Sequence, residues 1–426
     1  MSIQFTAHHA RNLAASILGL TLLAFSGAPA LAQPLLSLPD ALSRAAASDP
    51  TSSANAARLD AAGANVRQAS FGPRPRLGID VEDFSGSAPY TGVNRAQSTA
   101  YYEQIWERGG KREARVGVAQ ADVETTRQKA SIRLLDIIAK VQIAWVDAAA
   151  AEAAITVAEE RLRIAERLEQ EVQRRVSRAL DPVFAGERAK AASAQARIAR
   201  DQAVESARIA RTTLASWWAG SADFRVDVQD YLRTDGKRVA VESNPELALL
   251  AAEREVANAS IRLAESGSSA DPTFRVGIRH FAADSGLAVI VGGSVPIGVE
   301  SANISNIERA QAQRRAAEAD LAVSRLEVRR EADQLAADRV RITSEIARID
   351  SEVLPTAERA ASLVVQGYTR GGTAFTYLEM ADAQRAVIEA RMRRIELLRQ
   401  FHQEGARLDR LSGRYSALTV SSEKKQ

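Results

Sequence analysis

Few residues of this sequence have types and spacings that could support catalysis or metal binding. The 426 residues include four histidines and no cysteine, which excludes thiolate ligands, thiol nucleophiles, disulfides and a lipid-modified cysteine. His8 and His9 lie in an N-terminal segment with the pattern of a signal peptide, and His280 and His402 are too isolated for a ligand cluster or a nucleophile and base. We therefore predict no catalytic residue, no metal site and no cofactor. The protein should not be an enzyme.

The glycine-rich stretches do not predict a phosphate-binding loop. Gly109-Gly110-Lys111 and Gly292-Gly293-Ser294 lack the spacing of such a loop, and we interpret both as turns. The 56 basic and 53 acidic residues are interleaved and give a formal net charge of +3. The sequence pI of about 9.2 is therefore a weak argument for nucleic-acid binding, and we expect no nucleic-acid partner.

The first 32 residues have the pattern of a cleaved signal peptide. Arg11 precedes an apolar run at 13–25, and Ala30-Leu31-Ala32 forms a small-x-small peptidase site before Gln33. A transmembrane anchor is the alternative, but the run is shorter than the usual ~20 residues. We predict that the chain is exported. No later stretch reaches about 18 uninterrupted apolar residues, so any membrane crossing must be made by β-strands.

One very long helix is predicted from 111 to 178. Residues 118–181 contain no glycine or proline and are rich in side chains that favour helices. At 1.5 Å per residue, such a helix is about 100 Å long. It is too long for a small compact domain, so other elements must cover its apolar stripe along the whole length.

The composition of this helix predicts close neighbours on more than one side. Alanine is concentrated in its middle, and small side chains let helices approach closely, as in a ring of helices. Glu159 with Arg163 and Glu171 with Arg175 stand four residues apart, and we interpret these pairs as ion pairs on a solvated face.

The chain matches itself at an offset of roughly 195 to 200 residues, which indicates an internal duplication. Each half is predicted as a short helix, an extended hairpin, a very long helix, a tight break and a returning helix. The returning helices are predicted at 183–217 and 375–411, and the second long helix at 302–366 with a kink at Pro355. We divide the chain into a signal peptide (1–32), a first repeat (33–220), a connector that could hold a short strand (221–242), a second repeat (243–415) and a polar tail (416–426).

Each extended hairpin has the alternation of a membrane strand. Leu77, Ile79 and Val81 alternate with polar or small residues, and the second copy repeats the pattern at 274–278 and 287–291. A small soluble hairpin is the alternative, but runs of about 9 to 11 residues suit a tilted membrane strand. Four strands cannot close a wide barrel. A trimer with twelve strands would remove every exposed edge.

The two breaks between the helices are predicted to project from the same end of the molecule. They lie at 175–182 and 367–375, at equivalent points of the duplicated unit. A plain helix-turn-helix link would explain their glycine and proline residues. Paired tips at one end would also form a docking surface.

Two segments carry a resemblance to a known family. Residues 102–112 (YEQIWERGGKR) are similar to a strand-to-helix junction, and Gly367-Tyr368-Thr369-Arg370-Gly371-Gly372 with 378–385 (LEMADAQR) is similar to a hairpin tip, of the TolC-type outer membrane efflux factors. Within that family the chain resembles the CzcC-like cation-efflux branch. The resemblance covers essentially the whole chain after the signal peptide.

The resemblance implies a mainly α fold with a β-barrel part. Duplicated helical hairpins would form a trimeric α-barrel in the periplasm, and four transmembrane strands per chain would complete a twelve-stranded barrel in the outer membrane. The homotrimer would contact outer membrane lipid, a periplasmic adaptor (membrane fusion) protein and an inner-membrane RND pump. The tip residues implied to contact the adaptor are Arg178, Leu180, Asp181, Pro182, Tyr368, Arg370, Gly371, Gly372 and Thr373.

The resemblance also implies acidic residues that narrow the pore just past the second tip. The nearest candidates are Glu379 and Asp382, although Tyr377 and Met380 align more directly with the constricting positions. An exposed acidic residue on a helix is otherwise only solubilising.

The function predicted from these features is a passive exit duct for metal cations. The same duct could serve drug efflux or type I protein secretion. A periplasmic adaptor or a structural coiled-coil protein is a further alternative, but an adaptor should show one helical hairpin flanked by soluble β-domains.

Overall fold

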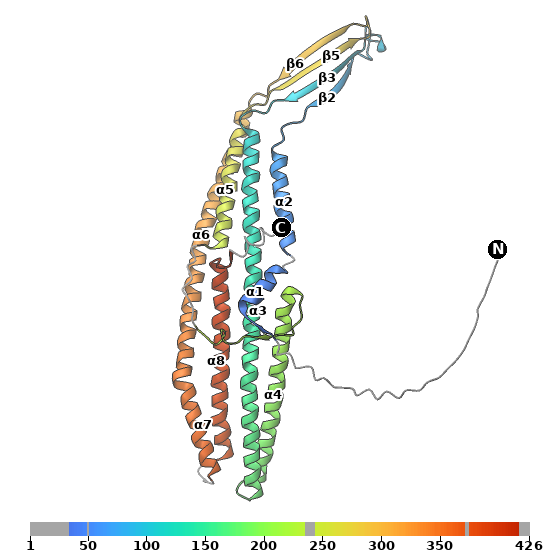
Figure 1. Ribbon diagram of the computed structural model, residues 1–426. Helices are drawn as coiled ribbons and strands as arrows, with labels where there is room; N and C mark the ends of the chain where they lie inside the picture. Colours follow the sequence, from blue (N-terminus) through green and yellow to red (C-terminus); the bar gives the residue numbers. More distant parts are fainter. Residues whose placement is uncertain (1–33, 49–50, 235–242, 371–374, 417–426) are drawn as a thin grey trace, which may run out of the picture.

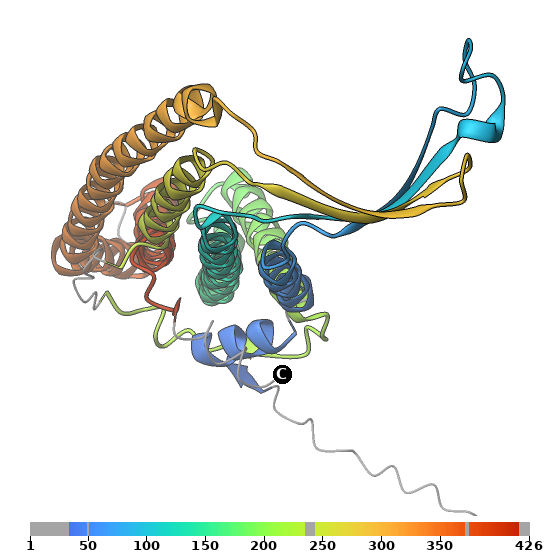
Figure 2. The same cartoon turned by 90° about the horizontal axis from the view of Figure 1, so that it is seen from above.

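The long helices run along one axis, and a four-stranded sheet extends from one end of them (Figure 1). The computed structural model describes residues 34–48, 51–234, 243–370 and 375–416. The predicted signal peptide and most of the predicted tail lie outside these residues. Seen from above, the helices stand side by side in an arc, and the sheet leaves them as a curved ribbon (Figure 2). The helices are α1 (Leu38–Ala47), α2 (Thr51–Ala69), α3 (Lys111–Ser177), α4 (Val183–Ala215), α5 (Pro245–Ser266), α6 (Val299–Arg348), α7 (Leu354–Thr369) and α8 (Tyr377–Leu411).

The first helical hairpin agrees closely with the prediction. Helix α3 is one unbroken helix of 67 residues, and α4 returns along it. Alanine side chains that are fully buried in the middle of α3, such as Ala148 and Ala149, let its neighbours pack closely. Glu159 and Arg163 are 3.9 Å apart, as predicted. The predicted pair of Glu171 with Arg175 is wrong, because Glu171 binds Arg174 instead and Arg175 turns toward the tip.

The kink predicted at Pro355 takes the form of a π-helical turn. Helix α6 ends at Arg348, the turn occupies Ile349–Val353, and α7 begins at Leu354 with Pro355 in its first turn. Proline cannot donate a backbone hydrogen bond and clashes with the turn before it, so the helix widens locally rather than stopping. An ion pair of 2.7 Å from Arg394 on α8 to Asp350 holds this turn.

The sheet joins the two repeats at its centre. Its order is β2-β3-β5-β6 and all its pairs are antiparallel, with strands β2 (Arg76–Glu82), β3 (Gln97–Ile105), β5 (Thr273–Phe281) and β6 (Leu287–Ser294). The edge strands have 7 and 8 residues, fewer than predicted. Each edge strand has one neighbour only, so it ends where its pairing with that neighbour ends.

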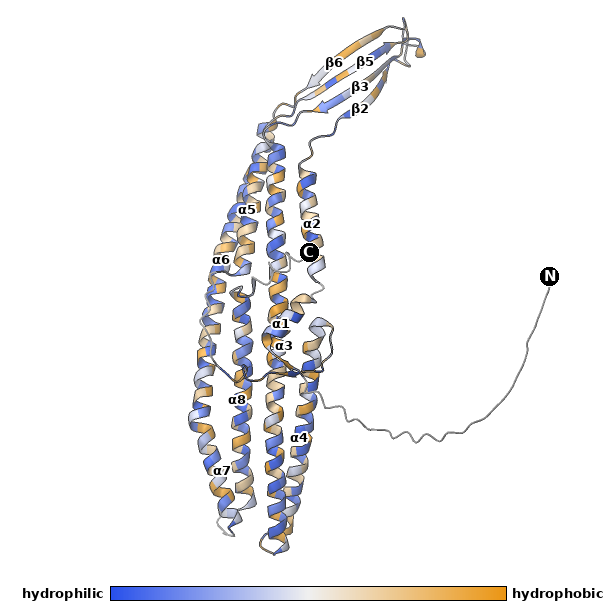
Figure 3. Ribbon diagram, in the orientation of Figure 1, coloured by the Kyte–Doolittle hydropathy of each residue, from blue (hydrophilic) through white to orange (hydrophobic). Residues whose placement is uncertain are grey.

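Hydrophobic and hydrophilic residues alternate along the strands (Figure 3), and because successive side chains point to opposite faces, the two faces of the sheet differ in polarity. One face carries a row of exposed apolar side chains, among them Leu77 (86% exposed) and Val291 (79% exposed). The other face carries ion pairs. Arg275 binds Glu103 at 2.8 Å and stacks over Tyr101, and Arg279 binds Glu82 at 2.7 Å.

Tyr101 on this polar face lies across two glycines of the neighbouring strands. A Cβ at Gly78 would displace the end of this ring, and a Cβ at Gly277 would lie 2.6 Å from the carbonyl oxygen of Ala100 and 2.9 Å from the Tyr101 Cβ. The ring covers the backbone that these glycines leave bare, which fixes the register of strands β2, β3 and β5.

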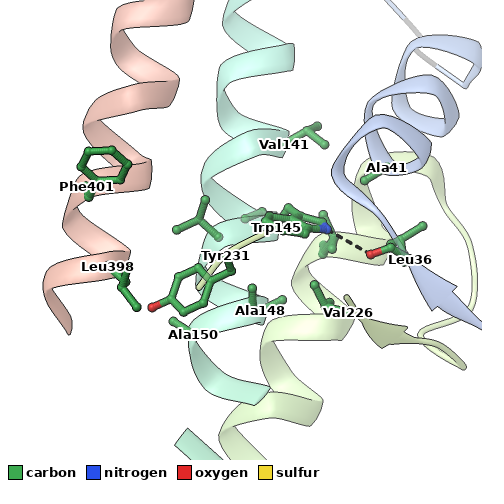
Figure 4. Close-up of a cluster of buried hydrophobic side chains, with 14 of the residues drawn as sticks. Leu36, Ala41, Val141, Trp145, Ala148, Ala150, Val226, Tyr231, Leu398 and Phe401 are labelled. Atoms are coloured by element: carbon green, nitrogen blue, oxygen red, sulfur yellow. Dashed lines mark hydrogen bonds between the residues drawn. The ribbon is translucent and has the colours of Figure 1, made fainter. Parts of the chain in front are cut away.

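A buried cluster at mid-height holds the helices together (Figure 4). Trp145 of α3 donates a hydrogen bond of 3.2 Å from Nε1 to the carbonyl of Leu36. Leu36 lies in β1 (Leu35–Leu36), which pairs in parallel with β4 (Arg225–Val226). Tyr231 donates from its hydroxyl to the carbonyl of Ile395 on α8 at 2.6 Å. The segment 221–234, predicted as a connector, therefore does more than link the repeats, because it fastens α3 to α8.

The strand-to-helix junction fastens the repeats a second time. Gly110, with φ of 71°, precedes α3, and Gly298, with φ of 74°, precedes α6. This left-handed conformation favours glycine. Lys111 reaches across to Asp271 of the second repeat at 2.6 Å and to the carbonyl of Ser269 at 2.7 Å. The glycine-lysine stretch is thus a turn, as predicted. The turn predicted at Gly292-Gly293-Ser294 is wrong, because these residues end strand β6 and pair with β5.

In the described part of the chain, no helix combines the length and the apolar character that crossing a membrane requires.

Candidate functional site: the tips of the two helical hairpins

The first tip is a short turn between α3 and α4. The helix ends at Ser177, Ala179 adopts a left-handed conformation with φ of 57°, and the amide of Leu180 donates back to the carbonyl of Arg175 at 2.9 Å. Pro182 then precedes the first residue of α4. A proline at the start of a helix loses nothing, because the first amides of a helix have no partner within it.

An ion pair within the first tip is joined to the second tip by two hydrogen bonds. Arg175 donates to Asp181 from Nε at 2.9 Å and from Nη1 to the carbonyl of Tyr368 at 2.9 Å. The hydroxyl of Tyr368 donates to the same carboxylate of Asp181. The guanidinium also stacks over the Tyr368 ring, 4.4 Å from its centroid. Each of the three side chains therefore contacts the other two.

The surroundings of these groups fix their charges. Burial alone would raise the pKa of Asp181, but the hydrogen bonds from Arg175 and Tyr368 outweigh it and the pKa is lowered. Burial raises the pKa of Tyr368, and its hydrogen bond to Asp181 raises it further. The hydrogen bond to Asp181 raises the pKa of Arg175. At neutral pH the network is thus a charged pair with a neutral tyrosine.

An apolar cluster supports this network from above. Its buried members come from all four helices that meet there, and they are Leu168, Val172, Ala185, Ala189, Tyr368 and Met380. Tyr368 is only 1% exposed. The two tips form one packed unit within the chain rather than two separate loops.

The residues predicted to contact an adaptor fall into three groups. Arg178, Leu180, Pro182 and Arg370 are exposed, whereas Asp181 is half-buried and Tyr368 is buried. Gly371, Gly372 and Thr373 lie outside the described residues. Tyr368 and Asp181 hold the tips together, so the surface open to a partner is made by the exposed group.

Sequence reasoning missed two apolar residues on this surface. Val183 and Phe184 open α4 and are 73% and 63% exposed, next to Leu180. The signal was present in the sequence, since two large apolar residues directly after a turn proline have no inward position to fill. Together Leu180, Val183 and Phe184 form an apolar patch, which we call the tip patch.

The two candidate residues for a pore constriction are exposed on the first turns of α8. Glu379 caps the helix, because its carboxylate accepts from the backbone amide of Thr376 at 2.7 Å while the Thr376 side chain accepts from the amide of Glu379. The backbone hydrogen bond from Thr376 lowers the pKa of Glu379. Asp382 pairs with Arg385 at 3.2 Å.

Neither of the two residues that align more directly with a constriction is fully exposed. Met380 is buried in the tip cluster, and Tyr377 is half-buried with Arg188 6.0 Å from its ring centroid.

The two described histidines have different settings. His280 lies on β5, and His402 packs against Tyr231, with Nε2 2.8 Å from the carbonyl of that residue. Burial lowers the pKa of His402, which keeps it neutral. No group of three or more potential ligand side chains that could hold a metal ion occurs among the described residues.

Known proteins similar to this chain share its architecture over most of its length. No family model matches it. The cobalt-zinc-cadmium resistance protein CzcC of Cupriavidus metallidurans is 28% identical over 394 residues, which cover 89% of this chain and 90% of CzcC. The nickel-cobalt-cadmium resistance protein NccC of Alcaligenes xylosoxydans xylosoxydans is 26% identical over 297 residues, covering 67% of this chain and 66% of NccC.

The solved structures give the same result for the fold. The outer membrane protein VceC of Vibrio cholerae matches with a TM-score of 0.71 and 17% identity, covering 88% of this chain and 96% of VceC. In fold, this chain is similar to the TolC-type outer membrane channels. In sequence it is similar to CzcC and NccC, in agreement with the resemblance carried by the junction and tip motifs.

Proposed function

We propose that this protein is the outer membrane channel of a tripartite RND efflux pump and that it gives metal cations a passive exit path. The observation that carries the proposal is the similarity to CzcC across 89% of the chain. CzcC and NccC are both named for resistance to divalent metals. In this proposal the cations are cargo, and the pump and the adaptor select them.

The sheet supports the placement in the outer membrane. Its apolar face is exposed along four strands, from Leu77 on β2 to Val291 on β6. In water this face would be a large unpartnered apolar surface, whereas against acyl chains it is matched. We expect cleavage of the signal peptide near Ala32 and a helical body in the periplasm.

The free edges of the sheet support a homotrimer. Strands β2 and β6 each pair on one side only, so each leaves a row of unpaired backbone groups. Pairing of β6 of one chain with β2 of the next satisfies both edges, and three chains close a twelve-stranded barrel.

The trimer can be tested by cross-linking, because the chain has no native cysteine. One cysteine on β2 (Ile79→Cys) is combined with a cysteine at each of several positions along β6, beginning with Val289→Cys. Oxidation should produce dimers and trimers in a denaturing gel and nothing larger. A ladder that continues beyond three chains would contradict ring closure.

The polar face of the sheet suits a duct through which cations pass without tight binding. Its acidic side chains are already paired, since Arg275 lies 2.8 Å from Glu103 and 3.4 Å from Asp80. Arg279 binds Glu82 in the same way. A carboxylate held by a guanidinium has little to offer a hydrated divalent ion.

The tips support docking of a periplasmic adaptor that bridges to an inner-membrane RND pump. The tip patch is apolar and exposed, Arg178 and Pro182 belong to the same turn, and Arg370 is exposed on the second tip. We propose that the adaptor covers this patch and contacts Gly371, Gly372 and Thr373. We also propose that Glu379 and Asp382 narrow the pore beside it.

Metal tolerance tests the proposed cargo. Deleting the gene should lower the tolerated concentrations of zinc, cobalt and cadmium, and the intact gene should restore them. Tolerance to hydrophobic drugs and secretion of proteins should stay unchanged. A strain that loses drug tolerance but keeps metal tolerance would show that the cargo is wrong while the channel remains. Recovery of the protein as a soluble periplasmic monomer would contradict the channel itself.

A further inference from the structure

A pocket lies where the sheet meets the helices, at the base of the apolar face. Its volume is about 500 Å³, and its lining includes Trp106, Phe274, Lys111, Arg112, Glu107 and Glu113. Trp106 and Phe274 are 64% and 52% exposed, and their ring centroids are 6.1 Å apart. Phe274 belongs to the same face as Val276 and Ile278, so the pocket continues the apolar surface of the sheet toward the helices.

Two of the charged groups in this pocket are already satisfied. Lys111 binds Asp271 and the carbonyl of Ser269. Arg115 donates hydrogen bonds to both carboxylate oxygens of Glu107. Neither group has capacity left for a strong ligand.

The other two charged groups remain open. Arg112 is half exposed, and its ion contact is a distant one, 3.9 Å from Glu107. Its guanidinium lies against Gly72, where a Cβ would be 2.3 Å from Nη2, so the chain leaves room for it there. Glu113 is exposed and has no hydrogen bond or ion pair within the described part of the chain. The pocket thus combines aromatic rings, one open guanidinium and one open carboxylate.

We propose that this pocket binds one glycerophospholipid with a primary ammonium headgroup. Arg112 receives the phosphate, Glu113 receives the ammonium, and the acyl chains lie on Trp106 and the apolar face. Guanidinium groups bind phosphate oxygens by charge-assisted hydrogen bonds, and aromatic side chains collect at the membrane-water boundary. The proposal rests on the proposed placement of the sheet in a membrane.

The ammonium is the discriminating part of this ligand. A primary ammonium donates hydrogen bonds to a carboxylate, whereas a choline headgroup has no N–H and a glycerol headgroup has no positive charge. The loss of one charged hydrogen bond weakens binding about tenfold. We therefore expect phosphatidylethanolamine to bind more tightly than phosphatidylcholine or phosphatidylglycerol by about that factor.

Tryptophan fluorescence can measure this preference, because only Trp106 lies near the sheet. Trp145 is buried at mid-height and Trp217 and Trp218 pack against the same cluster. Lipids with brominated acyl chains quench tryptophan on contact, so in detergent micelles they should quench Trp106 alone. The lipid mole fraction that gives half-quenching is measured for each headgroup, and Trp106→Phe should remove the quenched component.

Three variants separate the roles of the two charges. In Glu113→Gln, phosphatidylethanolamine should reach half-quenching at the same mole fraction as phosphatidylcholine. Arg112→Gln should weaken the binding of both lipids equally, because both carry the phosphate. Arg309→Gln removes an exposed arginine of α6 that does not line the pocket, and it should change neither lipid. Size-exclusion elution of each variant at the wild-type position shows that it is folded.

The possible failures are distinguishable. Quenching of Trp106 at equal mole fractions of all three lipids, or an unchanged preference in Glu113→Gln, would overturn the headgroup pocket and leave the membrane placement intact. Absence of quenching by any brominated lipid or brominated detergent would overturn the membrane placement itself.

Discussion

Removing the Tyr368 hydroxyl should loosen the joined tips by a predictable amount. Tyr368→Phe deletes the donor to Asp181 and keeps the ring that stacks under Arg175. A hydrogen bond to a charged group contributes about 1.5 to 3 kcal/mol. Asp181 keeps its bonds from Arg175 at 2.9 and 3.3 Å, so we expect the lower end of that range, about 1.5 kcal/mol. Separation of the tips should become about tenfold more frequent.

Amide hydrogen exchange measures this separation. Peptides that cover 172–184 and 362–370 should exchange about tenfold faster in Tyr368→Phe than in the wild type, while peptides from the middle of α3 stay unchanged. The matched control is Tyr377→Phe, because the Tyr377 hydroxyl has no hydrogen bond among the described residues. Equal rates in the two variants, or a change below about twofold in Tyr368→Phe, would refute the role given to this hydrogen bond.

Three further predictions follow from the site and the sheet. The pKa of Asp181 is lowered from its ordinary 3.8, so its contribution to tip stability is present above that pH and is lost as the pH falls through the lowered pKa. Amide hydrogen exchange at the tips, corrected for the intrinsic exchange rate, should therefore rise below about pH 4. This pH dependence should disappear in Asp181→Asn. Gly277→Val should impair trimer assembly, measured as trimer yield in the outer membrane, because a Cβ there lies 2.6 Å from a backbone oxygen of β3, whereas Gly292→Val on β6 meets nothing within 4 Å and should assemble normally. Glu379→Ala should destabilise the start of α8, because the backbone amide of Thr376 loses its acceptor while the Thr376 side chain still caps the helix, and faster exchange of that amide would show this. Glu379→Gln, which can still accept the hydrogen bond, should keep the cap and change only the cation selectivity of conductance if the residue lines the pore.

The helical body could be predicted because its determinants are local. The absence of glycine and proline over 118–181 defines α3, and Pro355 marks the π-helical turn, so both are visible in the sequence without knowledge of the fold. The alternation at Leu77, Ile79 and Val81 likewise identified the apolar face of β2.

The features that were missed depend on contacts between distant segments. Strand β1 has two residues and pairs with β4 from the connector, a contact that leaves no periodicity to detect. Arg175 stood four residues from Glu171 but binds Asp181 beyond the turn and the carbonyl of Tyr368 on the other hairpin. Tyr368 was predicted as a surface residue of the tip for the same reason, since its burial depends on four helices meeting there.

The π-helical turn at Ile349–Val353 sets the rotational phase of everything below it. A π turn holds one residue more than an α turn, so it acts as an insertion that shifts the following helix by about 100° about its axis. Deleting one residue between Ile349 and Val353, together with Pro355→Ala, would restore a continuous α-helix and rotate α7 by that angle. Tyr368 would then leave Asp181 and Arg175 and face solvent. A one-residue length change about 15 residues away along the chain thus decides whether the two tips can recognise each other at all.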